Sequence, residues 1–245
     1  MKKLLFLFVL VTALSVTSQE SVLLRANYKK GDVLEVKMEQ SQNMGAKGGV
    51  DMKMSMDMIV TSKDGDIITT ESKIKSINMN MLQGGIAMSY DSAMKEEDLD
   101  EIGKMMKQQF DPMMKSTIIS KVNIQGEILE AKVEPSNPAM DQQLTKQAKV
   151  VKYPSEEVSV GTSWSDVTSQ QGMNVTSIFT VSKIENGKVY INITGSVTGM
   201  GEGDVKGDLV VDIETGIQDS ASSEMAINAG GIDMKFSTTT TMSKM

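Results

Sequence analysis

The chain has 245 residues, with 25 basic and 32 acidic side chains, 22 methionines, and neither cysteine nor histidine. The lack of cysteine excludes disulfides and a lipid anchor attached through a thiol, so the fold must be stabilised by its own core. Since histidine, the commonest general base, is also missing and no catalytic motif stands out, we predict that the protein is not an enzyme. We expect no cofactor and assign no catalytic or metal-binding residues.

The N-terminus has the features of a secretory signal peptide. Lys2 and Lys3 precede an apolar run over residues 4–14, and small and polar residues follow at 15–19. The run is shorter than the roughly 20 apolar residues of a membrane-spanning helix, and no later segment approaches that length. We therefore predict residues 1–19 as a signal peptide, cleaved near Ser18 or Gln19. The mature protein is expected in the periplasm or outside the cell, soluble and not membrane-spanning.

The mature chain is expected to be acidic. Loss of Lys2 and Lys3 leaves 23 basic and 32 acidic residues, a net charge of −9. Such a surface repels phosphate backbones, and the few aromatic residues are too scattered to form a stacking platform for bases. We therefore expect no nucleic-acid partner. Residues 20–245 have the length of a single β-rich domain.

Apolar residues in the first half of the mature chain recur at every second position, which is typical of a β-strand with one buried face. Leu34, Val36 and Met38 alternate with charged residues. The stretch DMKMSMDMIV at 51–60 places a methionine at every second position from Met52 to Met58.

Two segments in the middle of the chain have helical spacing. The first helix is predicted near 93–109, with an apolar stripe, acidic residues at its start and Pro112 at its end. Ser92 begins an S-x-x-K motif, which we interpret as a helix cap, not as a nucleophile, because the companion motifs of serine acyl-transfer enzymes are missing. The second helix is predicted near 138–150, after Asn137 as its cap.

Alternation resumes in the second half, over 189–197, 205–213 and 232–236. Asn186 and Gly187 are suited to the tight turn of a β-hairpin. About ten amphipathic strands are therefore predicted, and only two helices are available to cover their apolar faces. We therefore predict a mainly β fold, a curved antiparallel sheet resembling a half-barrel or barrel, with the two helices inserted mid-chain.

The methionines allow three interpretations. They could fill an ordinary apolar core, line a pocket that adapts to greasy ligands, or bind Cu(I) through their thioethers. In the pocket interpretation, the first helix packs over the sheet as a lid. The candidate ligand-binding residues are then Met52, Met54, Met56, Met58, Met79, Met81, Leu99, Ile102, Met106 and Phe110.

Three stretches carry a family resemblance: NYKKGDVLEVKMEQSQNM near the mature start, YPSEEVSVGTSW at 153–164 and VDIETGIQDSASSEM at 211–225. Together they resemble exported bacterial proteins of a domain-of-unknown-function family common in Bacteroidota. The resemblance implies no catalytic residues. The arrangement of strands around mid-chain helices is also similar to the half-barrel of periplasmic lipoprotein carriers.

The function expected from the sequence is non-catalytic binding of an apolar or amphiphilic ligand, such as a lipid, by an exported soluble protein. Two alternatives remain open. One is a structural or protein-interacting component of the cell envelope, and the other is a methionine-based copper binder.

Overall fold

The fold was analysed in a computed structural model, which describes residues 20–137, 141, 151–170 and 172–245. Most of these residues lie in antiparallel strands, as the period-two pattern predicts. The strands are β1 (Ser21–Val22), β2 (Val33–Asn43), β3 (Gly48–Asp64), β4 (Ile67–Gln83), β5 (Ile86–Asp91), β6 (Thr117–Asn123), β7 (Ile128–Glu134), β8 (Val158–Ser159), β9 (Ser163–Gln170), β10 (Met173–Glu185), β11 (Lys188–Gly199), β12 (Glu202–Asp212), β13 (Gln218–Ala229) and β14 (Ile232–Lys244).

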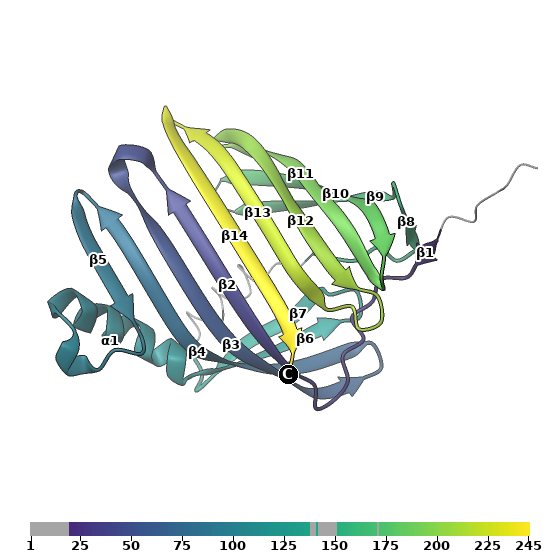
Figure 1. Ribbon diagram of the computed structural model, residues 1–245, viewed down its shortest axis with the longest axis horizontal. Helices are drawn as coiled ribbons and strands as arrows, with labels where there is room; N and C mark the ends of the chain where they lie inside the picture. The colour runs from purple at the N-terminus through teal and green to yellow at the C-terminus, as the bar shows by residue number, and fades with distance from the viewer. Residues whose placement is uncertain (1–19, 138–140, 142–150, 171) are drawn as a thin grey trace, which may run out of the picture.

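Twelve of the strands form one sheet in the order β7-β6-β4-β3-β2-β14-β13-β12-β11-β10-β9, with β5 paired beside β4 (Figure 1). The strands β1 and β8 form a separate two-stranded sheet. In the described part of the chain the edge strands β7 and β9 do not pair with each other, so the large sheet is curved but is not closed into a barrel. The predicted turn at Asn186–Gly187 is confirmed by the positive φ angles of 55° and 73° at these residues.

The sheet forks at β4. Its first half, from Ile67 to Lys73, pairs with β6, and its second half, from Asn78 to Gln83, pairs with β5. At the fork, the Ser92 amide donates to the Ile77 carbonyl oxygen, and the Ile77 amide donates to Ser92 Oγ, both at 2.9 Å. The prediction that Ser92 caps a helix is therefore wrong. Its hydroxyl instead accepts a hydrogen bond from the Ile77 amide of β4, which β5 leaves unpaired.

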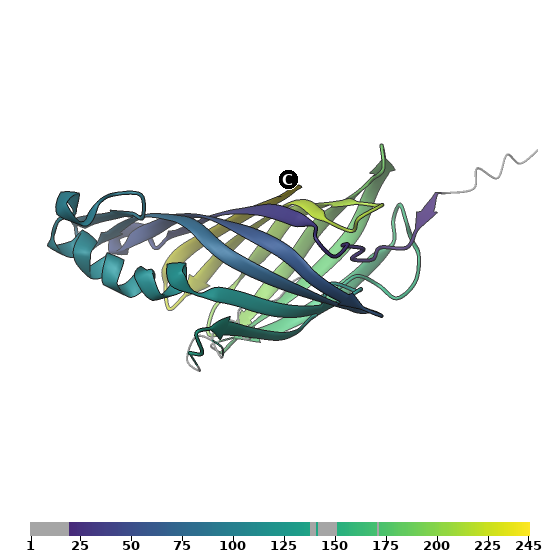
Figure 2. The same cartoon turned by 90° about the horizontal axis from the view of Figure 1, so that it is seen from below.

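The sheet has two chemically distinct faces. We call interior the face that carries Met52–Met58 at even positions, and outer the face that carries Asp51, Lys53 and Asp57. An additional residue, Lys75, interrupts the register between β3 and β4, and such bulges bend a sheet. The curvature brings β6 and β7 beneath the central strands (Figure 2), so the interior face is the concave face of the sheet.

One end of the concave face is closed by chain crossings, and we call this end the base. The Ala26 amide donates to the Ile124 carbonyl oxygen at 2.7 Å, and the Asn27 amide donates to the Thr215 carbonyl oxygen at 2.8 Å. The N-terminal segment thereby joins the β6–β7 turn to the β12–β13 turn. The buried Tyr153 adds a bond from its hydroxyl to the Gly216 carbonyl oxygen at 3.2 Å.

The first predicted helix exists but lies later in the chain than expected. Helix α1 spans Glu101–Lys115, and residues Glu96–Asp98 form only a short 3-10 turn before it. The helix begins at Glu101 because the Asp100 carboxylate accepts from the Gly103 amide at 2.7 Å, a typical N-cap. Pro112 lies inside the final turn, so the prediction that it ends the helix is also wrong.

The second predicted helix, near 138–150, falls outside the described residues except for Asp141, which is helical. Apart from Asp141, the helical residues that the structure describes belong to one α-helix, α1, and to two short 3-10 turns. The predicted signal peptide, residues 1–19, also lies outside the described residues.

Candidate ligand-binding face

The methionines of β2, β3 and β4 lie together on the interior face. Met38 is directly opposite Met54, and Met52 is directly opposite Met79. Directly opposed side chains in an antiparallel pair have Cβ atoms about 4.5–5.5 Å apart. The register therefore collects methionines from three neighbouring strands into one continuous area.

Helix α1 packs on this face over β4 and β5, at the left of Figure 1. The contact forms a methionine cluster, whose buried members are Ile74, Ile77, Tyr90, Met106 and Phe110 and whose half-buried members are Met54, Met79, Met81, Ile102, Met113 and Met114. At its centre the rings of Tyr90 and Phe110 stack with centroids 5.4 Å apart. Helix and sheet are thus in direct contact.

The structure separates the predicted site residues into three groups. Met54, Met79, Met81, Ile102, Met106 and Phe110 meet in the methionine cluster. Met52, Met56 and Met58 share the interior face and are half-buried, but they lie outside that cluster. Leu99 is buried just before α1 and packs against Gly103. That these residues contact a ligand stays a prediction.

Two ion pairs run along α1 beside the methionine cluster. Asp111 pairs with Lys107 at 2.9 Å and with Lys115 at 3.1 Å, and hydrogen bonds from both lysines hold the pKa of Asp111 below its usual range. Both are i,i+4 pairs, which stabilise a helix modestly. On β5, burial raises the pKa of the Tyr90 hydroxyl, which faces α1 in the methionine cluster.

The other side of the interior face is covered by a second cluster, which we call the valine cluster. Its buried members come from β8, β10, β11 and β12 and from the base: Leu24, Tyr153, Val158, Phe179, Val181, Val189, Ile191, Ile193, Leu209 and Val211. It contains no methionine among its buried members. The rings of Trp164 and Phe179 stack at 5.5 Å where it meets the edge strand β9.

Between the two clusters the interior face is polar in its half nearer the base, and it is apolar further from the base, where Met225, Met234 and Phe236 lie. Gln40, Thr238 and Ser223 lie side by side on β2, β14 and β13, since Gln40 is opposite Thr238 and Thr238 is opposite Ser223. Thr240 lies two residues further along β14, opposite Met38. The half nearer the base is therefore a strip of hydroxyl and amide groups bordered by apolar side chains.

A pocket of about 220 Å³ lies on this strip, and we call it the interior pocket. Its lining combines hydroxyl groups, apolar groups and the carboxyl group of one aspartate: Val151, Asp166, Thr168, Ser177, Phe179, Ile193, Val205, Ala221, Ser222, Ser223, Thr238 and Thr240. No residue of α1 contributes to it. No sequence motif marks these residues as a site. The alternation that places Met234 and Phe236 of β14 on the interior face continues directly to Thr238 and Thr240.

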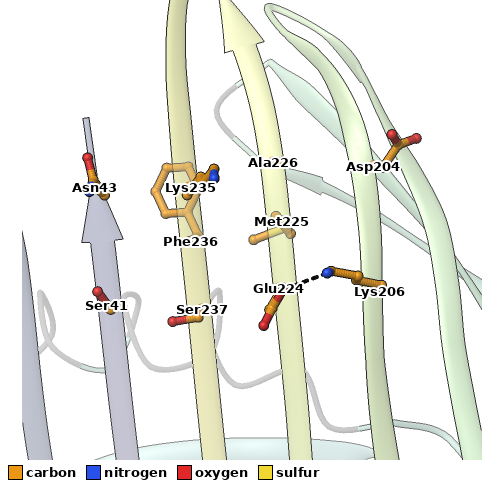
Figure 3. A pocket seen from close by; sticks show the side chains of 10 residues that line it. All are labelled: Ser41, Asn43, Asp204, Lys206, Glu224, Met225, Ala226, Lys235, Phe236 and Ser237. Atoms are coloured by element: carbon orange, nitrogen blue, oxygen red, sulfur yellow. Dashed lines mark ion pairs between the residues drawn. The ribbon is translucent and has the colours of Figure 1, made fainter. Parts of the chain in front are cut away.

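A larger pocket of about 560 Å³ lies on the outer face across β2, β14, β13 and β12 (Figure 3). Its charged lining residues are Lys206, Lys235, Asp204 and Glu224, two of each sign. Lys206 and Glu224 form an ion pair at 2.9 Å across the neighbouring strands. Because these charges balance, the outer pocket offers no net field that would favour a charged ligand.

Two features are absent from the described residues. No group of three or more Asp, Glu, His or Cys side chains is placed to hold a metal ion among them. Within the same residues, no helix is long and apolar enough to cross a membrane.

Comparison with known proteins agrees with the fold and with the expected family resemblance. No curated protein is significantly similar in sequence. A solved structure described as "Lipid-protein interactions in lipovitellin" matches 89% of this chain with a TM-score of 0.56 and 9% identity. The match covers 25% of the lipovitellin chain, so it extends over about a quarter of that protein and shows a shared fold.

The family comparison concerns the C-terminal part. The predicted resemblance to a family of unknown function is confirmed there, and two of the three stretches that suggested it, 153–164 and 211–225, fall within the matched region. Residues 131–244 match the model of DUF6263, a family of unknown function.

Proposed function

We propose that this protein is exported and binds an apolar or amphiphilic ligand of the lipid type on the interior face of its sheet. The observation that carries the proposal is the interior pocket, where a polar strip lies between two apolar clusters. A ligand with a polar group and an apolar chain would be complementary to both parts of this surface.

The polar strip would fix the position of such a ligand. Small-molecule sites combine mostly apolar walls with a few convergent polar groups that determine orientation. Ser223 and Thr238 supply hydroxyl groups that both donate and accept hydrogen bonds, and Ile193 and Phe179 supply apolar wall on one side. The interior pocket alone holds only part of a lipid, because about 300–1,000 Å³ is typical of a site for a drug-sized ligand.

The apolar part of the ligand would lie on the methionine side chains beside the polar strip. Met38 is opposite Thr240, and Met52 is opposite Gln40, so methionine side chains begin directly where the polar strip ends. Met52, Met56 and Met58 are only half-buried. Unbranched thioether side chains adapt to ligands of different shape, which suits an acyl chain.

The comparisons support this proposal only at the level of architecture. The lipovitellin structure is one of lipid–protein interactions, and this chain shares its fold with a quarter of that protein. Export is proposed from the N-terminal sequence pattern, and the absence of cysteine excludes anchoring through a lipidated thiol.

The test compares two neighbouring residues of one strand. Thr238 points to the interior pocket and Thr239 to the outer face. We expect a fluorescent fatty acid to bind the wild type with micromolar affinity and to be displaced by host lipid. Thr238→Trp should weaken binding by about tenfold by filling the pocket, while Thr239→Trp binds like the wild type. Absence of binding by the folded wild type, or equal effects of both variants, would contradict the proposal.

A Cu(I) site is a second candidate, favoured by the two directly opposed pairs Met38–Met54 and Met52–Met79. Thioethers bind Cu(I), and one ion could contact several of these side chains. Competition for Cu(I) with a chromogenic chelator tests it. The wild type should compete, and the double variant Met52→Leu with Met54→Leu should not.

A further inference from the structure

The two ends of the large sheet differ in the composition of their turns. The end opposite the base, uppermost in Figure 1, carries the turns β4–β5, β2–β3, β13–β14 and β11–β12, at residues 82–87, 44–47, 229–232 and 199–201. We call these four turns the glycine rim. Of their 17 residues, seven are glycine and Lys47 is charged, and the charged Glu202 follows directly at the start of β12.

The base has the opposite character. Its turns β3–β4, β10–β11, β12–β13 and β6–β7 lie at residues 63–66, 185–188, 212–217 and 123–127. Of these 19 residues, eight are charged. Glycine is ordinary in hairpin turns at both ends, so the feature that sets the glycine rim apart from the base is its scarcity of charged side chains.

The glycine rim also exposes large apolar side chains. The exposed fractions are 73% for Met200, 60% for Ile86 and 48% for Leu82. The backbone leaves little alternative to glycine beside them, because a Cβ atom at Gly48 would lie 1.8 Å from the Leu82 carbonyl oxygen. The apolar side chains are therefore presented on narrow tips with little surrounding side-chain bulk.

The four turns are consecutive in the sheet. The strand order β5-β4-β3-β2-β14-β13-β12-β11 places one turn after every second strand. Neighbouring strands lie about 4.8 Å apart, so the tips follow one another at about 10 Å. The rim is thus a row of separate apolar tips and not one continuous patch.

We propose that the glycine rim docks on a lipid surface by inserting its tips among the headgroups. A folded protein partner would need a matching row of pockets at the same spacing, whereas a fluid lipid phase accommodates separated tips without shape complementarity. Apolar side chains of peripheral proteins reach about 5–10 Å into the boundary between headgroups and acyl chains, which a hairpin tip can do.

The charge of the protein determines which lipids suit the rim. The chain carries a net charge of −7, and Lys47 is the one cation of the glycine rim. Anionic lipids would repel the protein as a whole and gain little at the rim. We therefore expect docking on zwitterionic surfaces, driven by apolar contact.

The rim adjoins the interior face. A pocket of about 540 Å³ lies beside the β2–β3 and β4–β5 tips, and its lining includes interior-face residues such as Val50, Met81 and Met88 together with outer-face residues such as Ser41, Asp51 and Asn80. On the other side, Gly201 lies against the buried Ile227 of the interior face. A lipid leaving the surface at the rim would meet the methionine area first. Docking itself does not require that the proposed ligand binding occurs, and the experiment below measures docking alone.

The experiment places the reporter on the tips, because the apolar run at residues 4–14 could by itself hold the full chain on a vesicle. Full-length Ile86→Trp and Met200→Trp are mixed with phosphatidylcholine vesicles containing brominated lipid, and Glu214→Trp at the base is the matched control. The native Trp164 is common to all three proteins. We expect a blue shift and at least about twofold stronger quenching for the two tip variants than for the control.

A second comparison tests the apolar side chains themselves. In the Met200→Trp protein, the added changes Leu82→Asp and Ile86→Asp should reduce the quenching several-fold, with an unchanged circular dichroism spectrum. Equal quenching of tip and base reporters, or no quenching of the tip reporters, would overturn the proposal. A blue shift that follows protein concentration without vesicles would overturn it as well, and would assign the rim to contacts between copies of the chain.

Discussion

The valine cluster and the methionine cluster cover the same face of one sheet with different kinds of side chain. In the valine cluster, Val181, Val189, Ile191, Leu209 and Val211 are at most 1% exposed. In the methionine cluster, the sheet residues Met54, Met79 and Met81 remain half-buried beneath α1. Branched side chains have few rotamers and hold one packing arrangement, whereas methionine adapts to its surroundings.

This difference divides the molecule into a rigid part and an adaptable part. The valine cluster joins β8, β10, β11 and β12 to the base, so its packing fixes the curvature of the sheet. The methionine cluster attaches one helix to two strands and borders the polar strip. A protein that accepts ligands of varying shape would need the valine cluster to stay fixed while the methionine cluster rearranges.

The largest expected effect tests the rigid part. Leu209→Ala should lower the free energy of unfolding by about 4 kcal/mol, because Leu209 is 1% exposed and its neighbours have little freedom to fill the cavity. Denaturant unfolding followed by circular dichroism measures it. The matched control is Val210→Ala on the outer side of the same strand, which should cost much less. A loss below about 1 kcal/mol for Leu209→Ala would show that this cluster is not rigid.

The next effect tests the contact of α1 with the sheet. Phe110→Ala removes the ring stacked on Tyr90 and should cost about 3 kcal/mol. Phe110→Leu, which keeps an apolar side chain of similar volume, should cost less than about 1.5 kcal/mol. Equal losses for the two variants would mean that ring stacking, not packing volume, holds the helix.

A smaller effect is expected within the row of methionines. Met54→Ala should cost about 2 kcal/mol because Met54 packs in the methionine cluster, and Met52→Ala should cost less than about 1 kcal/mol because Met52 lies outside it. Both residues are on the interior face of β3, so strand propensity cancels in the comparison. The opposite ranking would show that the methionine side chains beside α1 pack more tightly than those beneath it, contrary to the assigned methionine cluster.

The smallest effect concerns the strands between the two clusters. Asp32, just before β2, pairs with Lys244 of β14 at 2.7 Å and accepts from the Lys29 amide at 2.9 Å, and these contacts lower its pKa. A lowered pKa contributes stability above the ordinary aspartate pKa of about 4, and this stability is lost as the pH falls through the folded-state value. Asp32→Asn should therefore cost about 1 kcal/mol at pH 7 and less near pH 3.

Thermal melting of Asp32→Asn and wild type at both pH values checks this prediction. Asp51→Asn, exposed on the outer face of β3, is the control and should have little effect at either pH. A difference between Asp32→Asn and wild type that grows as the pH falls would contradict the assigned role of the ion pair.

The sequence by itself determined which residues form strands and which face each one buries. Alternation at 34–38, 52–58 and 205–213 is confirmed because one buried face per strand forces a period of two. It also predicted an amphipathic helix with Met106 and Phe110 on its buried side. Its start was misplaced by eight residues, from 93 to 101, because several acidic residues could begin a helix and only the Asp100–Gly103 bond selects one.

Only the tertiary structure decided which strands are neighbours and what the curved face contains. Pairing of β14 with β2 joins the two ends of the chain and places Thr238 beside Gln40, which no local pattern specifies. The same pairing separates the two apolar clusters by a polar strip and aligns the four glycine turns at one end. Alternation of apolar and polar residues predicts only which face of a single strand is buried. A binding site depends on which strands become neighbours, and long-range hydrogen bonds decide that order.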